Sequence, residues 1–183
     1  MSQGSRTYRM DLLRAAAIGA TGGLVLAAAQ MGLALWIFST PVIPAILSGL
    51  WIVPGVAALT ITRRGGTGLL AGALAAVICS VPSFSLTGLF LSVIAYGAAA
   101  ELPFFITRYR TWGMGIFLLS GLAGGIALAA TNFHLVALAA DGSFIIQVLG
   151  ITIILVSSLL CAASVIGGVW FRVTGTTSAG NRV

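Results

Sequence analysis

Glu101 is the residue with the clearest chemical potential in this sequence, because it is an acid inside an apolar stretch. No other charged residue occurs in 94–106, and Arg108 follows Glu101 after about 10 Å of helix rise. A carboxylate this deep in a bilayer costs about 2.5–3.5 kcal/mol and needs a partner. We expect either a contact with a polar or cationic substrate, or a hydrogen-bonded structural role facing the bundle or the nearby arginines.

Two aromatic residues stand away from the positions where membrane proteins place their interfacial belts, and both are candidate substrate contacts. The hydroxyl of Tyr96 requires a hydrogen-bond partner in an apolar stretch, so this side chain should face protein or a cavity. Trp51 is either a large packing residue between helices or a stacking platform for a ligand.

Further polar residues lie near the end of the apolar stretch 113–133 and the beginning of the next. Asn132, His134 and Gln147, with Gln30 at a comparable depth, could line a cavity open to the exterior. The alternative is solvation beside a loop, which we favour for Asp141. One histidine with scattered amides does not make a metal site, because zinc needs three or four suitably spaced ligands.

The elements that position these residues must lie in lipid. The chain of 183 residues is 59% hydrophobic and 7% charged, whereas a soluble domain is about 25% charged. This composition excludes both a soluble domain and a disordered chain. No nucleophile motif and no ATP-binding motif is present, so we expect neither an enzyme nor a cofactor.

Arginine clusters divide the chain into three apolar intervals, 15–62, 65–107 and 111–171, each long enough for two crossings. Because arginine marks the cytoplasmic side, the prediction is six helices with both termini cytoplasmic. We expect one integral membrane domain, 1–183, with helices at about 12–37, 43–62, 67–82, 86–107, 113–133 and 143–171. The net charge of +6 then reflects membrane orientation and does not indicate nucleic-acid binding.

Small residues recur at four-residue spacing, a pattern that lets helix backbones approach closely in lipid. The repeats are Ala15/Gly19/Gly23, Ala16/Ala20, Gly68/Gly72 and Gly121/Gly125. They predict packing inside the bundle. For the first helix the alternative is a partner interface formed by Ala16, Ala20, Gly19 and Gly23.

Two stretches give the sequence a family resemblance. Residues 50–55 (LWIVPG) run on to 63–66 (RRGG), and residues 97–104 (GAAAELPF) are followed by 108–112 (RYRTW). With six helices, these resemble the YkoE-type substrate-binding S components of energy-coupling factor (ECF) vitamin transporters. Tyr96, where the family pattern has a polar amide, and Pro103 depart from that pattern.

The resemblance implies a subunit of the prokaryotic cytoplasmic membrane that captures thiamine or its hydroxymethylpyrimidine precursor from outside. Its partners would be a transmembrane coupling (T) subunit and two ATPase domains, which supply the energy. Glu101 would recognise the aminopyrimidine or balance the thiazolium charge, supported by His134, Asn132 and Trp51. The alternatives are an S component for another small vitamin or heterocycle, and a membrane scaffold or assembly protein without a ligand.

Overall fold

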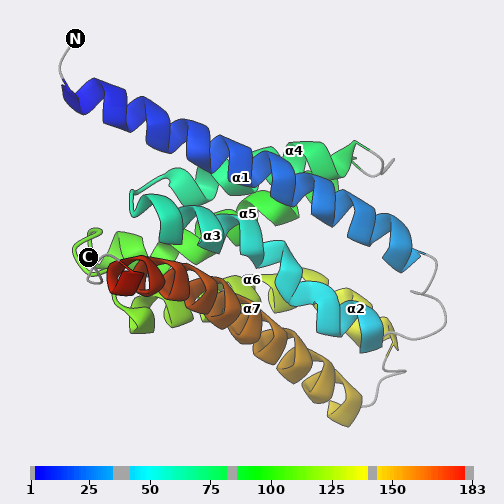
Figure 1. Ribbon diagram of the computed structural model, residues 1–183. Coiled ribbons are helices and arrows are strands. Elements are labelled where there is room, and N and C mark those ends of the chain that lie inside the picture. The colour runs from blue at the N-terminus through cyan, green and yellow to red at the C-terminus, as the bar shows by residue number, and fades with distance from the viewer. Residues whose placement is uncertain (1–2, 35–41, 82–85, 140–143, 180–183) are drawn as a thin grey trace.

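A computed structural model describes residues 3–34, 42–81, 86–139 and 144–179 (Figure 1), and all regular secondary structure in these ranges is α-helical or 3-10 helical. The elements in chain order are α1 (Gln3–Ala34), α2 (Val42–Leu47), η1 (Ser48–Ile52), α3 (Val53–Thr62), α4 (Thr67–Ser80), α5 (Leu86–Ile106), α6 (Met114–Ala139) and α7 (Phe144–Ala179). The expected all-α class with six helical segments is confirmed, since α2, η1 and α3 together occupy the predicted second segment. The helices differ from the expected ranges mainly in length: α1 begins nine residues earlier, and α6 and α7 continue beyond 133 and 171.

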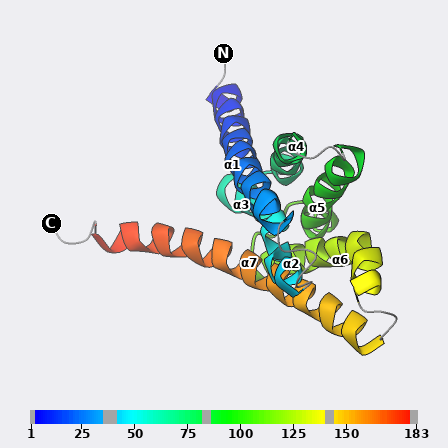
Figure 2. The same ribbon diagram turned by 90° about the vertical axis from the view of Figure 1, so that its right-hand side faces the viewer.

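Four segments are long and apolar enough to cross a membrane: Tyr8–Gly32, Ala45–Thr62, Met114–Thr131 and Phe144–Val169. The helices Thr67–Ser80 and Ile94–Ile106 are apolar but shorter. At about 1.5 Å per residue, α4 is about 21 Å long, which is less than the roughly 30 Å hydrocarbon core. The helix α7 is much longer than one crossing needs, and its C-terminal part runs away from the other helices (Figure 2).

The broken segment α2–η1–α3 lies at the centre of the helix arrangement. Helices α1, α4, α5, α6 and α7 pack in chain order, each against the next, and α3 contacts every one of them. The core includes Ile52 and Val56 from this segment, packed against Ala100 of α5 and Ala162 of α7. Any displacement of the central segment therefore disturbs several helix contacts at once.

The break in this segment is caused by a proline, and a side chain of another helix compensates for it. Pro54 has no N–H to donate to the carbonyl of Leu50, and the chain tightens into the 3-10 turn Ser48–Ile52 before it. The hydroxyl of Ser157 donates to the carbonyl of Ile46 and accepts from the N–H of Gly49 at 3.1 Å. A side chain of α7 thus satisfies backbone groups of the interrupted helix, as lipid surroundings require.

Small residues bring the neighbouring helices into close contact, as their spacing predicts. A Cβ atom added at Gly19 would lie 2.6 Å from the carbonyl oxygen of Ala71, and one at Gly121 would lie 2.5 Å from the Cβ of Ala162. Gly97 packs against the backbone of Gly68 and Gly72 in the same way. The stripes Ala15/Gly19/Gly23, Gly68/Gly72 and Gly121/Gly125 are therefore used for packing within the chain.

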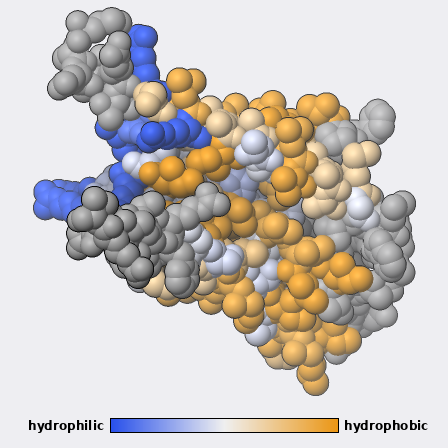
Figure 3. Space-filling model, viewed as in Figure 1, coloured by the Kyte–Doolittle hydropathy of each residue, from blue (hydrophilic) through white to orange (hydrophobic). Residues whose placement is uncertain are grey.

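All the arginines whose surroundings the structure describes lie at one end of the bundle, which we call the arginine end. It comprises the connections 63–66 and 107–113 and the beginning of α1, and α7 ends on the same side (Figure 1). Figure 3 shows hydrophilic residues gathered there, while hydrophobic residues cover most of the remaining described surface in that view. The beginning of α1 and the end of α7 at this same end are consistent with the predicted topology, and the side of the membrane on which this end lies stays a prediction.

Candidate functional site

Tyr96 and Trp51 meet in one hydrophobic cluster in the half of the bundle away from the arginine end. Tyr96 is buried there with Leu26, Cys79 and Leu128, and the half-buried Trp51 packs against the same cluster. The hydroxyl group of Tyr96 lies 2.9 Å from the hydroxyl of Thr131 on α6. The partner expected for a phenol in apolar surroundings is thus present, and it comes from a different helix.

A second polar contact lies in the same half of the bundle. The thiol of Cys79 on α4 donates to Oε1 of Gln30 on α1 at 3.2 Å. Gln30 was grouped with the outward polar residues in the sequence, and the structure places it beside the cluster that contains Tyr96. This half of the bundle thus combines two aromatic rings with neutral hydroxyl, thiol and amide groups.

The other candidate polar residues occupy α6 and α7. Gln147 is half-buried and lies one turn before Ile151, which packs against the Tyr96 cluster. Asn132 and His134 belong to the backbone of α6, but their side chains lie outside the described residues. Their predicted contribution to a site stays a prediction.

Glu101 lies nearer the arginine end of the bundle than Tyr96 does, and it faces the N-terminus of α4. Its side chain is buried, and Oε1 accepts a hydrogen bond of 2.9 Å from the N–H of Gly68. Gly66, the N-cap residue of α4, has a positive φ of 84° and offers no side-chain cap, and Gly68 is the second residue of the helix. A side-chain oxygen at this place performs the work of an N-cap, and its negative charge suits the positive end of the helix dipole.

The space for this contact is provided by glycine. A Cβ atom on Gly68 would lie 2.8 Å from Leu59 and 3.1 Å from Cγ of Glu101.

Tyr96 and Glu101 are separated by about 7 Å of helix rise and about 140° of rotation. The structure therefore brings Trp51 and Tyr96 together and places Glu101 in a separate environment, close to the arginine end.

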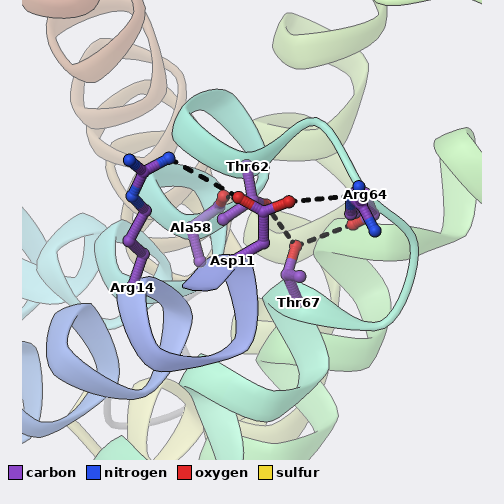
Figure 4. Close-up of polar contacts among 6 residues, drawn as sticks. All are labelled: Asp11, Arg14, Ala58, Thr62, Arg64 and Thr67. Carbon is purple, nitrogen blue, oxygen red and sulfur yellow. Dashed lines mark hydrogen bonds and ion pairs between the residues drawn. The ribbon is translucent and has the colours of Figure 1, made fainter. Parts of the chain in front are cut away.

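A network of charged and hydroxyl groups lies at the arginine end (Figure 4), and sequence analysis did not anticipate it. Asp11 of α1 is buried, and its carboxylate lies 2.8 Å from Nε of Arg64 and 3.5 Å from Nη1 of Arg14. The hydroxyls of Thr62 and Thr67 lie 2.7 Å apart, and Thr67 donates to the carbonyl of Arg64. These contacts fasten the connection 63–66 to α1.

The same connection is held on its other side by aromatic packing. A Cβ atom on Gly65 would lie 2.7 Å from the ring of Tyr109, so the two connections of the arginine end are in direct contact. Phe104, Trp112 and Phe117 pack beside Tyr109, with the ring centres of Phe104 and Trp112 5.1 Å apart. Burial, together with the negative charge of Glu101, raises the pKa of Tyr109.

The predicted partner interface on α1 divides into two parts. Gly19 and Gly23 are buried against Ala71 and Ala75 of α4, so both glycines are occupied by contacts within the chain. Ala16 and Ala20 are half-buried on the flank of that contact. A partner interface on α1 stays a prediction, and the two glycines of the predicted set already lie in contacts within the chain.

Sequence reasoning missed three residues that the structure gives clear roles. Asp11 had a signal, because it is the only acid within the first arginine cluster. Ser157 and Thr131 had none, since each acts on a helix distant in sequence. Such contacts between helices require the packing arrangement to be known first.

Comparison with known proteins places this arrangement in a family. Residues 10–127, well over half of the chain, match the family described as "ABC-type cobalt transport system, permease component". A solved structure described as "Crystal structure of an S-component of ECF transporter" has the same fold, with a TM-score of 0.77 and 21% sequence identity. The match covers 92% of this chain and 86% of that one. No curated protein matches by sequence. Because the family model matches residues 10–127, the chain belongs to the family of permease components of ABC-type cobalt transport systems.

Proposed function

We propose that this protein is the substrate-capture S subunit of an ECF-type importer. The observation that carries the proposal is the shared fold, which extends over 92% of the chain. Membership of a permease-component family supports the same role. A subunit of this kind binds its substrate and relies on other subunits for energy.

The partners that this role requires are a transmembrane T subunit and two ATPase domains. The sequence has no ATP-binding motif of its own, so the energy for transport has to come from these partners. We place the arginine end on the cytoplasmic side of a prokaryotic membrane, because arginine is retained on that side. The half that contains Trp51 and Tyr96 then faces the exterior, where substrate is captured.

The substrate that we propose is thiamine or its hydroxymethylpyrimidine precursor. The half-buried ring of Trp51 suits stacking against a flat heterocycle, with the buried Tyr96 in the same cluster and the half-buried Gln147 one turn before that cluster's Ile151. Asn132 and His134 would complete the contacts from α6. Since Glu101 already accepts a hydrogen bond from the backbone of α4, we assign it a structural role in this conformation. This assignment favours the neutral pyrimidine over the cationic vitamin.

A metal ion suits these residues less well than an organic molecule does. The family description names cobalt, but the sequence contains a single histidine and two cysteines. Within the described ranges, no three His, Cys, Asp or Glu side chains come together as metal ligands. Aromatic rings and neutral polar groups are typical of sites for small organic ligands.

The test is the thermal stability of the detergent-purified protein against hydroxymethylpyrimidine, thiamine, riboflavin, biotin and Co²⁺. A ligand that binds the native state raises the melting temperature once its concentration exceeds its Kd. We expect a shift with the pyrimidine that persists in Glu101→Gln and is reduced in Tyr96→Phe. A shift that disappears in Glu101→Gln would instead return this carboxylate to the substrate site.

The remaining outcomes separate the alternatives. A shift with riboflavin or biotin alone keeps the S-subunit role and replaces the substrate. A shift with Co²⁺ alone contradicts the organic substrate. A folded protein that responds to none of the panel favours a scaffold or assembly role.

A further inference from the structure

An open apolar groove runs between α1 and the central broken segment. Its volume is about 230 Å³, and its walls are formed by Ile18, Gly22 and Val25 on one side and Leu50, Val53 and Ala57 on the other. Gly22 lies against the ring of Pro54 at its floor. Val25 is 58% exposed, so no described part of the chain covers this side of the groove.

The groove points towards a pair of cationic side chains at the arginine end. Arg14 precedes Ile18 by one turn of α1, and Ile18, Thr21 and Val25 continue the same face at helical spacing. On the other wall, Arg64 follows the end of α3. A second hollow of about 310 Å³ lies there, lined by Tyr8, Asp11, Leu12, Arg64, Gly65 and Thr67.

Asp11 forms ion pairs with both arginines, and both arginine side chains remain partly exposed. One oxygen of its buried carboxylate faces Arg64 and the other faces Arg14. The side chains of Arg64 and Arg14 remain 40% and 57% exposed, and each guanidinium has five N–H donors. The Tyr8 ring also lies 5.8 Å from the Arg64 guanidinium carbon. Two guanidinium groups and one carboxylate leave a net positive charge at this site.

We propose that one anionic phospholipid occupies this site, with its phosphate on Arg14 and Arg64 and an acyl chain in the groove. The distance along α1 from Arg14 to Val25 is about 16 Å, which is close to the thickness of one hydrocarbon leaflet. Arginine suits a phosphate because its donors form a fork that matches two oxygens. The apolar groove and the cationic end thus fit the two parts of one lipid molecule.

This site is separate from the flank of α1 that carries Ala16 and Ala20. Ala16 lies about 200° around the helix from Ile18, so the alanines and the groove lie on opposite flanks of the contact with α4. A lipid in the groove and a partner on the alanine flank can therefore be tested independently. The proposal also does not depend on which substrate the protein captures.

The experiment measures lipid binding to the delipidated, detergent-purified protein by non-denaturing mass spectrometry. Phosphatidylglycerol and phosphatidylcholine with the same acyl chains are titrated separately. We expect one phosphatidylglycerol to bind at least about fivefold more tightly than phosphatidylcholine. Arg14→Gln and Arg64→Gln should each weaken its binding about fivefold, whereas Arg110→Gln, a change to an exposed arginine outside the site, should not.

The acyl-chain contact is tested with a matched pair of threonines. Thr21 and Thr152 are both exposed, and each hydroxyl donates to the carbonyl four residues earlier at 2.8 Å. Thr21→Phe fills the groove and should weaken phosphatidylglycerol binding, whereas Thr152→Phe on α7 should not. Excess glycerol phosphate, which has the headgroup chemistry without a chain, should fail to displace the lipid.

The opposite results overturn the proposal in distinct ways. Equal losses in Arg14→Gln and Arg110→Gln show non-specific lipid adsorption. Displacement by glycerol phosphate, or no effect of Thr21→Phe, shows an anion site without a chain contact. If Arg64→Gln does not fold, Arg14→Gln, whose side chain is more exposed, provides the same comparison.

Discussion

The two ends of this bundle use polar residues in different ways. At the arginine end, charged and hydroxyl groups join α1 to the connection 63–66 and α5 to the beginning of α4. In the other half, neutral groups such as Tyr96 and Gln30 lie among apolar side chains and next to Trp51. The difference indicates that charge stabilises one end, while aromatic and neutral polar groups suit the other for recognition.

This contrast separates two roles that depth in the membrane alone does not distinguish. Glu101 and Tyr96 are both buried polar residues of α5. Glu101 supports the first turn of a helix that has no cap of its own, whereas Tyr96 contacts another side chain in an aromatic cluster. A buried acid in a membrane helix can therefore serve the backbone of a neighbouring helix, and its function has to be read from its partner.

The largest effect on stability is expected at the break in the central segment, which lies between the two halves of the bundle. In Gly49→Ala the new Cβ would lie 2.5 Å from the carbonyl oxygen of Ser157, so η1 and α7 have to separate. We expect a loss of about 3 kcal/mol in unfolding free energy, measured by denaturant unfolding in detergent. Gly167→Ala is the control, because nothing lies within 4 Å of its added Cβ. Equal stability of the two variants would show that the break tolerates a wider separation.

A smaller effect is expected from the charge network of the arginine end. Asp11→Ala removes the shared partner of Arg14 and Arg64, and we expect a loss of about 1–2 kcal/mol because both arginines are partly exposed. A double-mutant cycle with Arg64→Gln measures the coupling directly. Substrate affinity should not change. Additive effects of the two substitutions would contradict a stabilising contact between Asp11 and Arg64.

Tyr96→Phe should produce the opposite result, with affinity affected more than stability. Loss of the hydroxyl removes its contact with Thr131, which holds the ring in place within the proposed substrate site. We expect substrate Kd to rise about fivefold, equivalent to about 1 kcal/mol, in calorimetric titration with the ligand found in the stability panel. Tyr8→Phe, at the exposed arginine end, should leave the Kd unchanged. An unaltered Kd in Tyr96→Phe would place the site elsewhere.

Much of the fold was predictable because lipid imposes strong constraints on the sequence. Arginine clusters and apolar lengths predicted six helical segments, and the small-residue stripes predicted close packing. The 3-10 turn Ser48–Ile52 was not predicted, although Pro54 lies just after it. Proline is tolerated in membrane helices when another side chain satisfies the freed groups, and here that side chain is Ser157, far away in the sequence.

The candidate site was predictable in its residue types but not in its grouping. The apolar stretch 86–107 predicted that Glu101 and Tyr96 lie in the same helix. Their hydrogen-bond partners, however, lie on α4 and α6 respectively. The α4 contact depends on Gly66 and Gly68, and the sequence indicated only a packing role for Gly68. Which neighbour faces each polar residue is decided by helix packing, and one sequence without related sequences does not specify it.

The smallest expected effect concerns the ionisation of Tyr109, and it tests whether Glu101 carries charge beside the connection 107–113. Burial and the negative charge of Glu101 both raise the pKa of Tyr109, because each disfavours the tyrosinate anion. In Glu101→Gln the second cause disappears, so this pKa should fall, while burial keeps it above its ordinary value. The measurement is an ultraviolet titration of tyrosinate absorbance in both backgrounds, with Tyr109→Phe subtracted to isolate this residue. A pKa that stays constant or rises would mean that Glu101 exerts no electrostatic influence at the arginine end, leaving the hydrogen bond to Gly68 as its only contribution there.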